Sequence, residues 1–159
     1  MLRVLSRLVI AALPTAFACV TCHGQDYANQ PIPLLVDGQV TDGEKKLVGA
    51  EVLVYKGNEL LVTVQTNKGG RFGVKLDIGE DYAMEFRQKG FVAKRISIDT
   101  RMPKPKPGQE FELVPLDITI SLLEKERYDG APTDDLDFPF ALIKFNKKTL
   151  AFEQDAEYT

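Results

Sequence analysis

Histidine, cysteine and tryptophan are nearly absent from this chain of 159 residues. The sequence has one histidine, two cysteines and no tryptophan, and the histidine and both cysteines lie within Cys19–His23. The rest of the chain therefore has no thiolate or imidazole to serve as a nucleophile, as a triad base or as a zinc ligand. We predict no catalytic residues, no cofactor and no metal site, and hence that the protein is not an enzyme. A carboxylate pair of the glycosidase type is the chemistry that this composition leaves open.

Three short patterns suggest ligands but lack the context that each ligand requires. The residues Cys19-Val20-Thr21-Cys22-His23 match a c-type haem attachment motif, but they lie in an N-terminal targeting segment. Gly69-Gly70 lead into a strand pattern instead of a helix, so they do not form a phosphate-binding loop. The aspartates near position 134 lack the spacing and the glycine of a calcium loop. We interpret all three as coincidences.

The chain also lacks an excess of basic residues. It contains 20 basic and 23 acidic residues, for a net charge of -3. Two of the basic residues and none of the acidic ones lie in residues 1–24, so the remainder has 18 against 23 and a net charge of -5. Binding to a nucleic acid backbone requires a basic surface. We therefore predict no nucleic-acid partner.

The sequence has no apolar run long enough to span a bilayer. The run Leu8–Leu13 follows Arg3 and Arg7 and is much shorter than the roughly 20 residues of a membrane-spanning helix. Small residues follow it, which completes the three-part pattern of a secretory signal peptide. We predict a signal peptide in residues 1–24 and no transmembrane span.

The signal predicts export to the periplasm, the outer-membrane surface or the extracellular space. Cleavage after Ala18 and cleavage after Gly24 both fit the small residues at the processing site. A lipid anchor on Cys19 or Cys22 is the alternative, but the residues preceding both cysteines fit a lipoprotein signal poorly.

Short alternating runs separated by glycine turns make up the rest of the chain. In 71–76, Phe72, Val74 and Leu76 share one face and polar residues share the other, as in a half-buried strand. Strands are expected at 34–40, 47–55, 60–66, 71–76, 81–87, 91–99, 110–122, 138–145 and 149–153. Strands spaced in this way predict an all-β sandwich or barrel.

The composition divides the chain into four parts. We expect the signal peptide at 1–24, a linker at 25–33, a sandwich at 34–122, and an acidic linker with a C-terminal hairpin at 123–159. Lys104 and Lys106 alternate with prolines in 103–107, which cannot complete a strand ladder. We interpret this segment as a crossover whose lysines keep a sheet edge soluble, and a contact loop for a partner is the alternative.

Several of these turns and strands carry a recurring pattern. Gly38-Gln39-Val40 opens the first strand, Gly49-Ala50-Glu51-Val52 enters the second, and Thr66-Asn67-Lys68-Gly69-Gly70-Arg71-Phe72 forms a turn. Lys89-Gly90-Phe91 follows the fifth strand. Together these runs resemble the carboxypeptidase regulatory-like domain over roughly 34–100. Asn67 replaces the usual aspartate of that family and Phe91 replaces the usual tyrosine.

The resemblance implies a transthyretin-like Greek-key β-sandwich of about seven strands, here with an extra C-terminal hairpin. It implies a standalone secreted bacterial form of a module that is non-catalytic in the family. Each matched position has an expected physical role. Gly70 provides a backbone conformation that a side chain would strain, Phe72 anchors the core, and Gly49 with Ala50 permits close packing.

These observations predict an exported, non-catalytic module that acts in protein interaction or structural support at the bacterial cell envelope. The expected partner is another envelope protein, bound at an exposed sheet edge or at the Lys104–Lys106 loop. The alternative is a carbohydrate-binding module of starch-binding-like fold. That function would need exposed aromatic side chains on one surface, for which Tyr55 and Tyr128 are the candidates.

Overall fold

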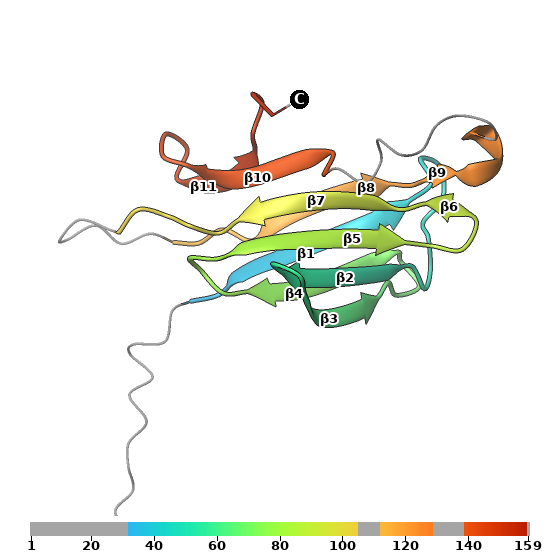
Figure 1. Cartoon of the computed structure of the whole chain (residues 1–159), viewed down its shortest axis with the longest axis horizontal. Coiled ribbons are helices and arrows are strands. Elements are labelled where there is room, and N and C mark those ends of the chain that lie inside the picture. The colour runs from blue at the N-terminus through green and yellow to red at the C-terminus, as the bar shows by residue number, and fades with distance from the viewer. Residues whose placement is uncertain (1–31, 105–111, 129–138, 159) are drawn as a thin grey trace, which may run out of the picture. The chain divides into compact units, whose positions relative to one another are not determined.

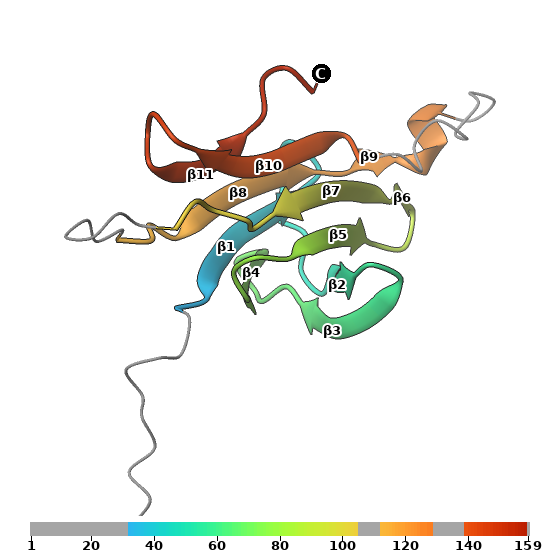
Figure 2. The same ribbon diagram turned by 60° about the vertical axis from the view of Figure 1, so that its left-hand side comes forward.

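The protein folds into two stacked β-sheets with a small third sheet, as the computed structural model shows (Figures 1 and 2). The structure describes residues 32–104, 112–128 and 139–158. One sheet has the order β4-β1-β8, with bounds Arg71–Leu76, Leu34–Thr41 and Leu116–Ser121. The larger sheet has the order β11-β10-β7-β5-β2-β3, with bounds Ala151–Gln154, Ala141–Asn146, Lys94–Asp99, Asp81–Arg87, Glu51–Lys56 and Glu59–Gln65. The third sheet pairs β6, Phe91–Val92, with β9, Leu123–Glu124, and a 3₁₀ turn follows at Lys125–Tyr128.

The all-β sandwich prediction is confirmed. The predicted inward residues of β4 and β5 are buried, and the rings of Phe72 and Phe86 meet across the two sheets at a centroid distance of 5.6 Å. The described residues contain nine strands of four or more residues, besides the two-residue strands β6 and β9. The C-terminal hairpin of β10 and β11 extends the larger sheet, because β10 pairs in parallel with β7.

Four strands, β2, β8, β10 and β11, begin later than the sequence pattern suggests. β2 begins at Glu51 instead of position 47, because Gly49 has a φ of +73° and the Ala50 N–H donates to the Thr66 hydroxyl instead of a strand carbonyl. β8 begins at Leu116, directly after Pro115, which cannot donate to a ladder. Val114, which falls within the expected strand 110–122, is 61% exposed because it precedes β8.

The turn at residues 67–71 is docked on β1. The Asn67 side-chain oxygen accepts hydrogen bonds from the N–H groups of Gly69 and Arg71, at 2.8 and 3.1 Å. The Gly70 carbonyl accepts the N–H of Val40 at 2.8 Å. Gly70 itself has a φ of +68°, and a Cβ there would lie 2.8 Å from the Val40 carbonyl oxygen. A side chain at this position would therefore be both strained and obstructed.

Gly49 has a different role from the one that the resemblance suggests. A Cβ at this position would meet no atom within 4 Å, so close packing does not explain the glycine, and its positive φ does. Close packing applies instead at Gly38, where a Cβ would lie 2.6 Å from the Phe72 ring and 2.6 Å from the Ile118 carbonyl oxygen.

A buried carboxylate organises the outer face of the larger sheet. Glu85 is 6% exposed and is flanked by Arg87 at 2.5 Å and by Arg95 at 3.0 Å. Burial raises the pKa of Glu85, but hydrogen bonds from the two guanidinium groups outweigh it and hold the pKa below its usual value. The ionised carboxylate therefore stabilises the fold.

We expect Gly70→Ala to destabilise the fold more than Gly49→Ala, although both glycines have a positive φ. Gly49→Ala incurs only the conformational cost, about 1–2 kcal/mol. Gly70→Ala adds a collision with a backbone oxygen, which no rotamer change relieves, and we expect an additional cost of about 1–3 kcal/mol. Urea unfolding of both variants measures the two costs. Equal losses of unfolding free energy would show that the docking of the turn on β1 is unimportant.

We expect Glu85→Gln to reduce the free energy of unfolding at neutral pH by about 1–2 kcal/mol, because it removes the charge that accepts hydrogen bonds from Arg87 and Arg95. The loss is modest because both guanidinium groups are half exposed and their interaction with the carboxylate is screened by solvent. The folded-state pKa is lowered, so this stabilisation is fully present above the ordinary glutamate pKa. It disappears as the pH falls through the lowered folded-state value. Urea unfolding of both proteins across acidic pH tests this. A stability difference that stays constant with pH would contradict it.

Candidate functional site

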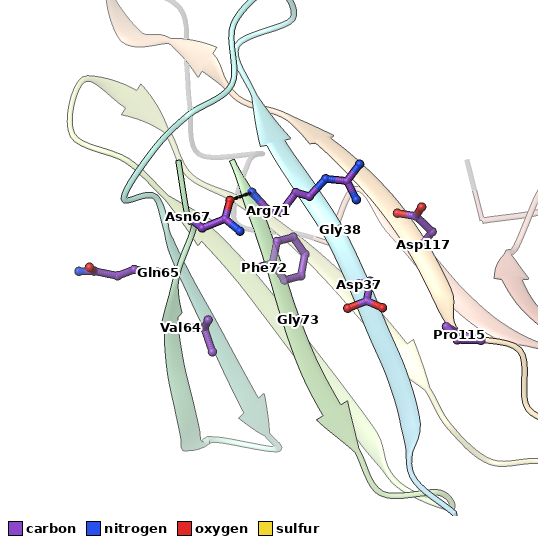
Figure 3. A pocket seen from close by; sticks show the side chains of 10 residues that line it. All are labelled: Asp37, Gly38, Val64, Gln65, Asn67, Arg71, Phe72, Gly73, Pro115 and Asp117. Carbon is purple, nitrogen blue, oxygen red and sulfur yellow. Dashed lines mark hydrogen bonds between the residues drawn. The ribbon is translucent and has the colours of Figure 1, made fainter. Parts of the chain in front are cut away.

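A groove runs along β4, between β3 on one side and β1 and β8 on the other (Figure 3). It consists of two adjoining depressions of about 660 and 460 Å³, which share Asp37, Val64 and Gly73. Gly73 lies on its floor, where the absence of a side chain leaves room for a side chain of β1. β3 contributes the apolar wall through Val62 and Val64, which pair with the core residues Val54 and Val52 of β2.

Two carboxylates form the opposite, polar wall of this groove. Asp37 lies between Gly73 and Asp117 in one cross-strand row, and both aspartates are exposed. The Asp37 Oδ1 atom lies 2.9 Å from the position that a Cβ of residue 73 would occupy, so the glycine lets this carboxylate lie over β4. Figure 3 shows the Arg71 side chain crossing from β4 towards the same row. Like charges directly opposite each other on paired strands repel.

β3 forms one edge of the larger sheet, and no described strand pairs with its outer side (Figure 1). Six of its seven residues are exposed, including Leu60, Leu61 and Val62 at 48%, 47% and 42%. Leu61 is the extra residue of a β-bulge, because Val62 pairs with Val54 while Leu60 pairs with Tyr55. An exposed apolar edge of this kind is a ready template for another strand.

The other three edge strands of the two stacked sheets differ from β3. β4 presents Arg71 and Lys75 on its exposed face, β8 follows Pro115 directly and presents Asp117, and β11 contains Glu153. Charges and proline at a sheet edge oppose pairing with further strands. The segment from Leu60 to Gln65 contains neither.

A smaller depression of about 370 Å³ lies between β8 and the β10–β11 hairpin. Its lining is mainly apolar and includes Leu116, Ile118 and Phe152. It marks the open side of the sandwich opposite the β3 edge.

The structure brings only some of the sequence-predicted residues to the groove. Gly38, Asn67 and Phe72 line it, while Ala50 and Gly70 are buried nearby and Gly49 is exposed. Gly90 and Phe91 belong to the β6 turn, away from the groove. Lys104 is exposed, and Lys106 lies outside the described residues. Tyr55, a candidate for sugar contact, is half-buried, and the side chain of Tyr128 lies outside the described part.

Sequence reasoning did not identify the residues that shape the site. Asp37, Gly73 and Asp117 fall within the expected strands 34–40, 71–76 and 110–122, but no site was predicted at any of them. The available signal was in β3, where Leu60, Leu61 and Val62 are consecutive apolar residues and therefore break the alternation of a half-buried strand.

Two classes of site are absent from the described residues. No group of three or more histidine, cysteine, aspartate or glutamate side chains among residues 32–104, 112–128 and 139–158 could hold a metal ion. Within the same ranges, no helix is both long and apolar enough to cross a bilayer.

The comparisons with known proteins concern the fold. No protein-family model matches the sequence, and no curated protein matches it. Similar solved structures include the Bacillus anthracis TIE protein, at 15% identity and a TM-score of 0.45 over 58% of this chain and 18% of that one. Another is a DUF3823 family protein from Parabacteroides merdae, at 13% identity and a TM-score of 0.42 over 60% of this chain and 48% of that one. The chain therefore spans less than two thirds of either protein.

The prediction that the chain is not an enzyme is contradicted. Three similar structures are dioxygenases, among them catechol 1,2-dioxygenase from Pseudomonas arvilla at 12% identity and a TM-score of 0.42, over 71% of this chain and 57% of that one. The scarcity of histidine and cysteine excludes chemistry that needs those residues, whereas carboxylates and tyrosines remain. We withdraw the prediction, and at 11–14% identity this likeness transfers no residue role or activity to the chain.

We expect Asp117→Asn to increase stability slightly at neutral pH and low salt, because it relieves repulsion with Asp37. The gain should shrink at high salt, where exposed charges are screened. Thermal unfolding at two salt concentrations measures it. A loss of stability at low salt would show instead that the Asp117 charge has a favourable partner.

Proposed function

We propose that the protein is an exported β-sandwich module, of the carboxypeptidase regulatory-like type, that acts in protein interaction at the bacterial cell envelope. Its contact surface is the outer edge of β3 together with the adjoining groove along β4. The partner is an extended segment of an envelope protein that adds to the larger sheet as a further strand. The observation that carries this proposal is the exposed segment Leu60–Gln65 of the β3 edge, which has no charged residue, in contrast to the charged edges of β4, β8 and β11.

The backbone of β3 is suited to strand addition. The Thr66 N–H donates to the Ala50 carbonyl at 2.9 Å, so the backbone at Thr66 faces β2. The direction of these groups alternates along an antiparallel strand. The backbone N–H and C=O groups of Val62 and Val64 therefore also point towards β2. Those of Thr63 and Gln65 point to the open edge. These groups supply the hydrogen bonds of an added strand.

The groove supplies the side-chain contacts. Val62 and Val64 would pack against apolar residues of the added strand, and Asp37 and Gln65 provide a polar rim. Removal of these apolar side chains from water favours the complex and offsets part of the translational, rotational and side-chain entropy lost on association. Main-chain bonds would give the affinity, and the groove would select among partner sequences.

The structure does not favour the carbohydrate alternative. Sugar binding would use an open aromatic face, and Phe140 and Tyr158 are the exposed aromatic side chains among the described residues. The Phe140 ring is covered by the Lys94 ammonium, whose Nζ lies 5.2 Å from the ring centroid. The Tyr158 hydroxyl donates a hydrogen bond to the Pro139 carbonyl oxygen at 3.1 Å.

Site-specific photo-cross-linking in the producing cell tests the proposed contact surface. A photoactivatable residue at position 61 should capture the same protein repeatedly, because Leu61 lies on the β3 edge. The matched control is position 150, where Leu150 has a similar exposure of 43% but lies in the β10–β11 turn. Equal capture from the two positions, or none from position 61, would contradict the proposal.

A further inference from the structure

We propose that the strand added to β3 is β3 of a second copy of this chain. The two strands would run antiparallel about a two-fold axis through Thr63. This inference rests on the proposed function and names the partner at the same surface. It follows from the residues of the β3 edge, from the direction of their backbone groups and from the charges on the other edges of the molecule.

The β3 sequence is complementary to itself in this register. Thr63 would lie opposite Thr63 of the second copy, Val62 opposite Val64, and Leu61 opposite Gln65. Threonine pairs and pairs of β-branched apolar residues both stabilise neighbouring strands. The paired segment contains no charged side chain, so no like charges meet although each copy carries a net negative charge.

The backbone fits the same register. Thr63 and Gln65 direct their N–H and C=O groups to the open edge, as the Thr66 bond to Ala50 indicates. A two-fold axis through Thr63 therefore allows Thr63 to exchange both of its hydrogen bonds with Thr63 of the second copy. The bulge at Leu61 lies at the end of the paired segment, where it does not interrupt the ladder.

The remaining edges explain why pairing would stop at two copies. A two-fold contact uses the same surface on both subunits and closes after one pairing. Further growth would need β4, β8 or β11, and each of these edges has charged residues that oppose pairing. A paired segment of five residues is smaller than a standard protein interface, so we expect a dissociation constant on the order of micromolar.

Sedimentation velocity of the protein as purified from its cells tests the inference. From low to high micromolar concentration, we expect the apparent mass to rise from one chain towards two. Thr63→Lys and Thr63→Glu should each remain monomeric, because the axis places identical charges opposite each other. An equimolar mixture of the two variants should form the dimer again, since opposite charges then meet. Thr119→Lys, at an exposed position on β8, is the matched control and should dimerise like the parent.

A parent protein that stays monomeric at every concentration would overturn the inference. So would dimerisation of either Thr63 variant alone, or failure of the mixture to dimerise, because both results exclude the axis through Thr63. Cross-linking from position 61 distinguishes failure of the second-copy inference from failure of the proposed function. A monomer that captures a different envelope protein overturns only the second-copy inference, whereas a monomer that captures nothing overturns both.

Discussion

The docking of the turn at residues 67–71 on β1 is the contact on which the rest of the structure depends. The Gly70 carbonyl accepts the Val40 N–H, and the Val40 carbonyl in turn accepts the N–H of Leu47. This position joins the entry to β4, the end of β1 and the loop before β2. A side chain at residue 70 would lie against the Val40 oxygen, so the chain can pass from one sheet to the other here only with a glycine. β3 and β4, which this turn connects, then become adjacent edges of two different sheets.

The candidate site follows from that arrangement. β3 continues the larger sheet beyond the point where β4 ends the smaller one, so Val62 stays exposed at the edge while Val64 packs partly buried against the core. Gly73 leaves room for the Asp37 carboxylate over β4. The result is an apolar edge beside a groove with a polar rim, in a molecule whose other edges are charged. Protein association by strand addition uses such a combination of unpaired backbone and adjacent side-chain pockets.

The similar solved structures include a dioxygenase, the TIE protein and a DUF3823 family protein, at TM-scores of 0.37 to 0.45. Fold alone does not determine function, because sites are built from particular residues on a shared frame. Composition had led us to exclude catalysis altogether, and that inference was too broad. A shortage of histidine and cysteine removes particular nucleophiles, bases and ligands, but it leaves carboxylate and tyrosine chemistry untouched.

Local chemistry in the sequence determined the strand-and-turn framework. Alternation in β4 and β5 predicts which side chains are buried, and Asn67 with Gly70 predicts the turn, because these effects depend on neighbouring residues. The start of β2 was not predicted, because it depends on the hydrogen bond from Ala50 to the distant Thr66. The exposure of Val114 and the role of Gly49 have local causes, Pro115 and a positive φ, that the strand pattern did not take into account. The existence and the lining of the groove depend on the tertiary structure alone. Its walls come from β3, which precedes β4 in the chain, and from β1 and β8, which lie far from β4 in the sequence. Only the packing of two unequal sheets leaves the β3 edge uncovered.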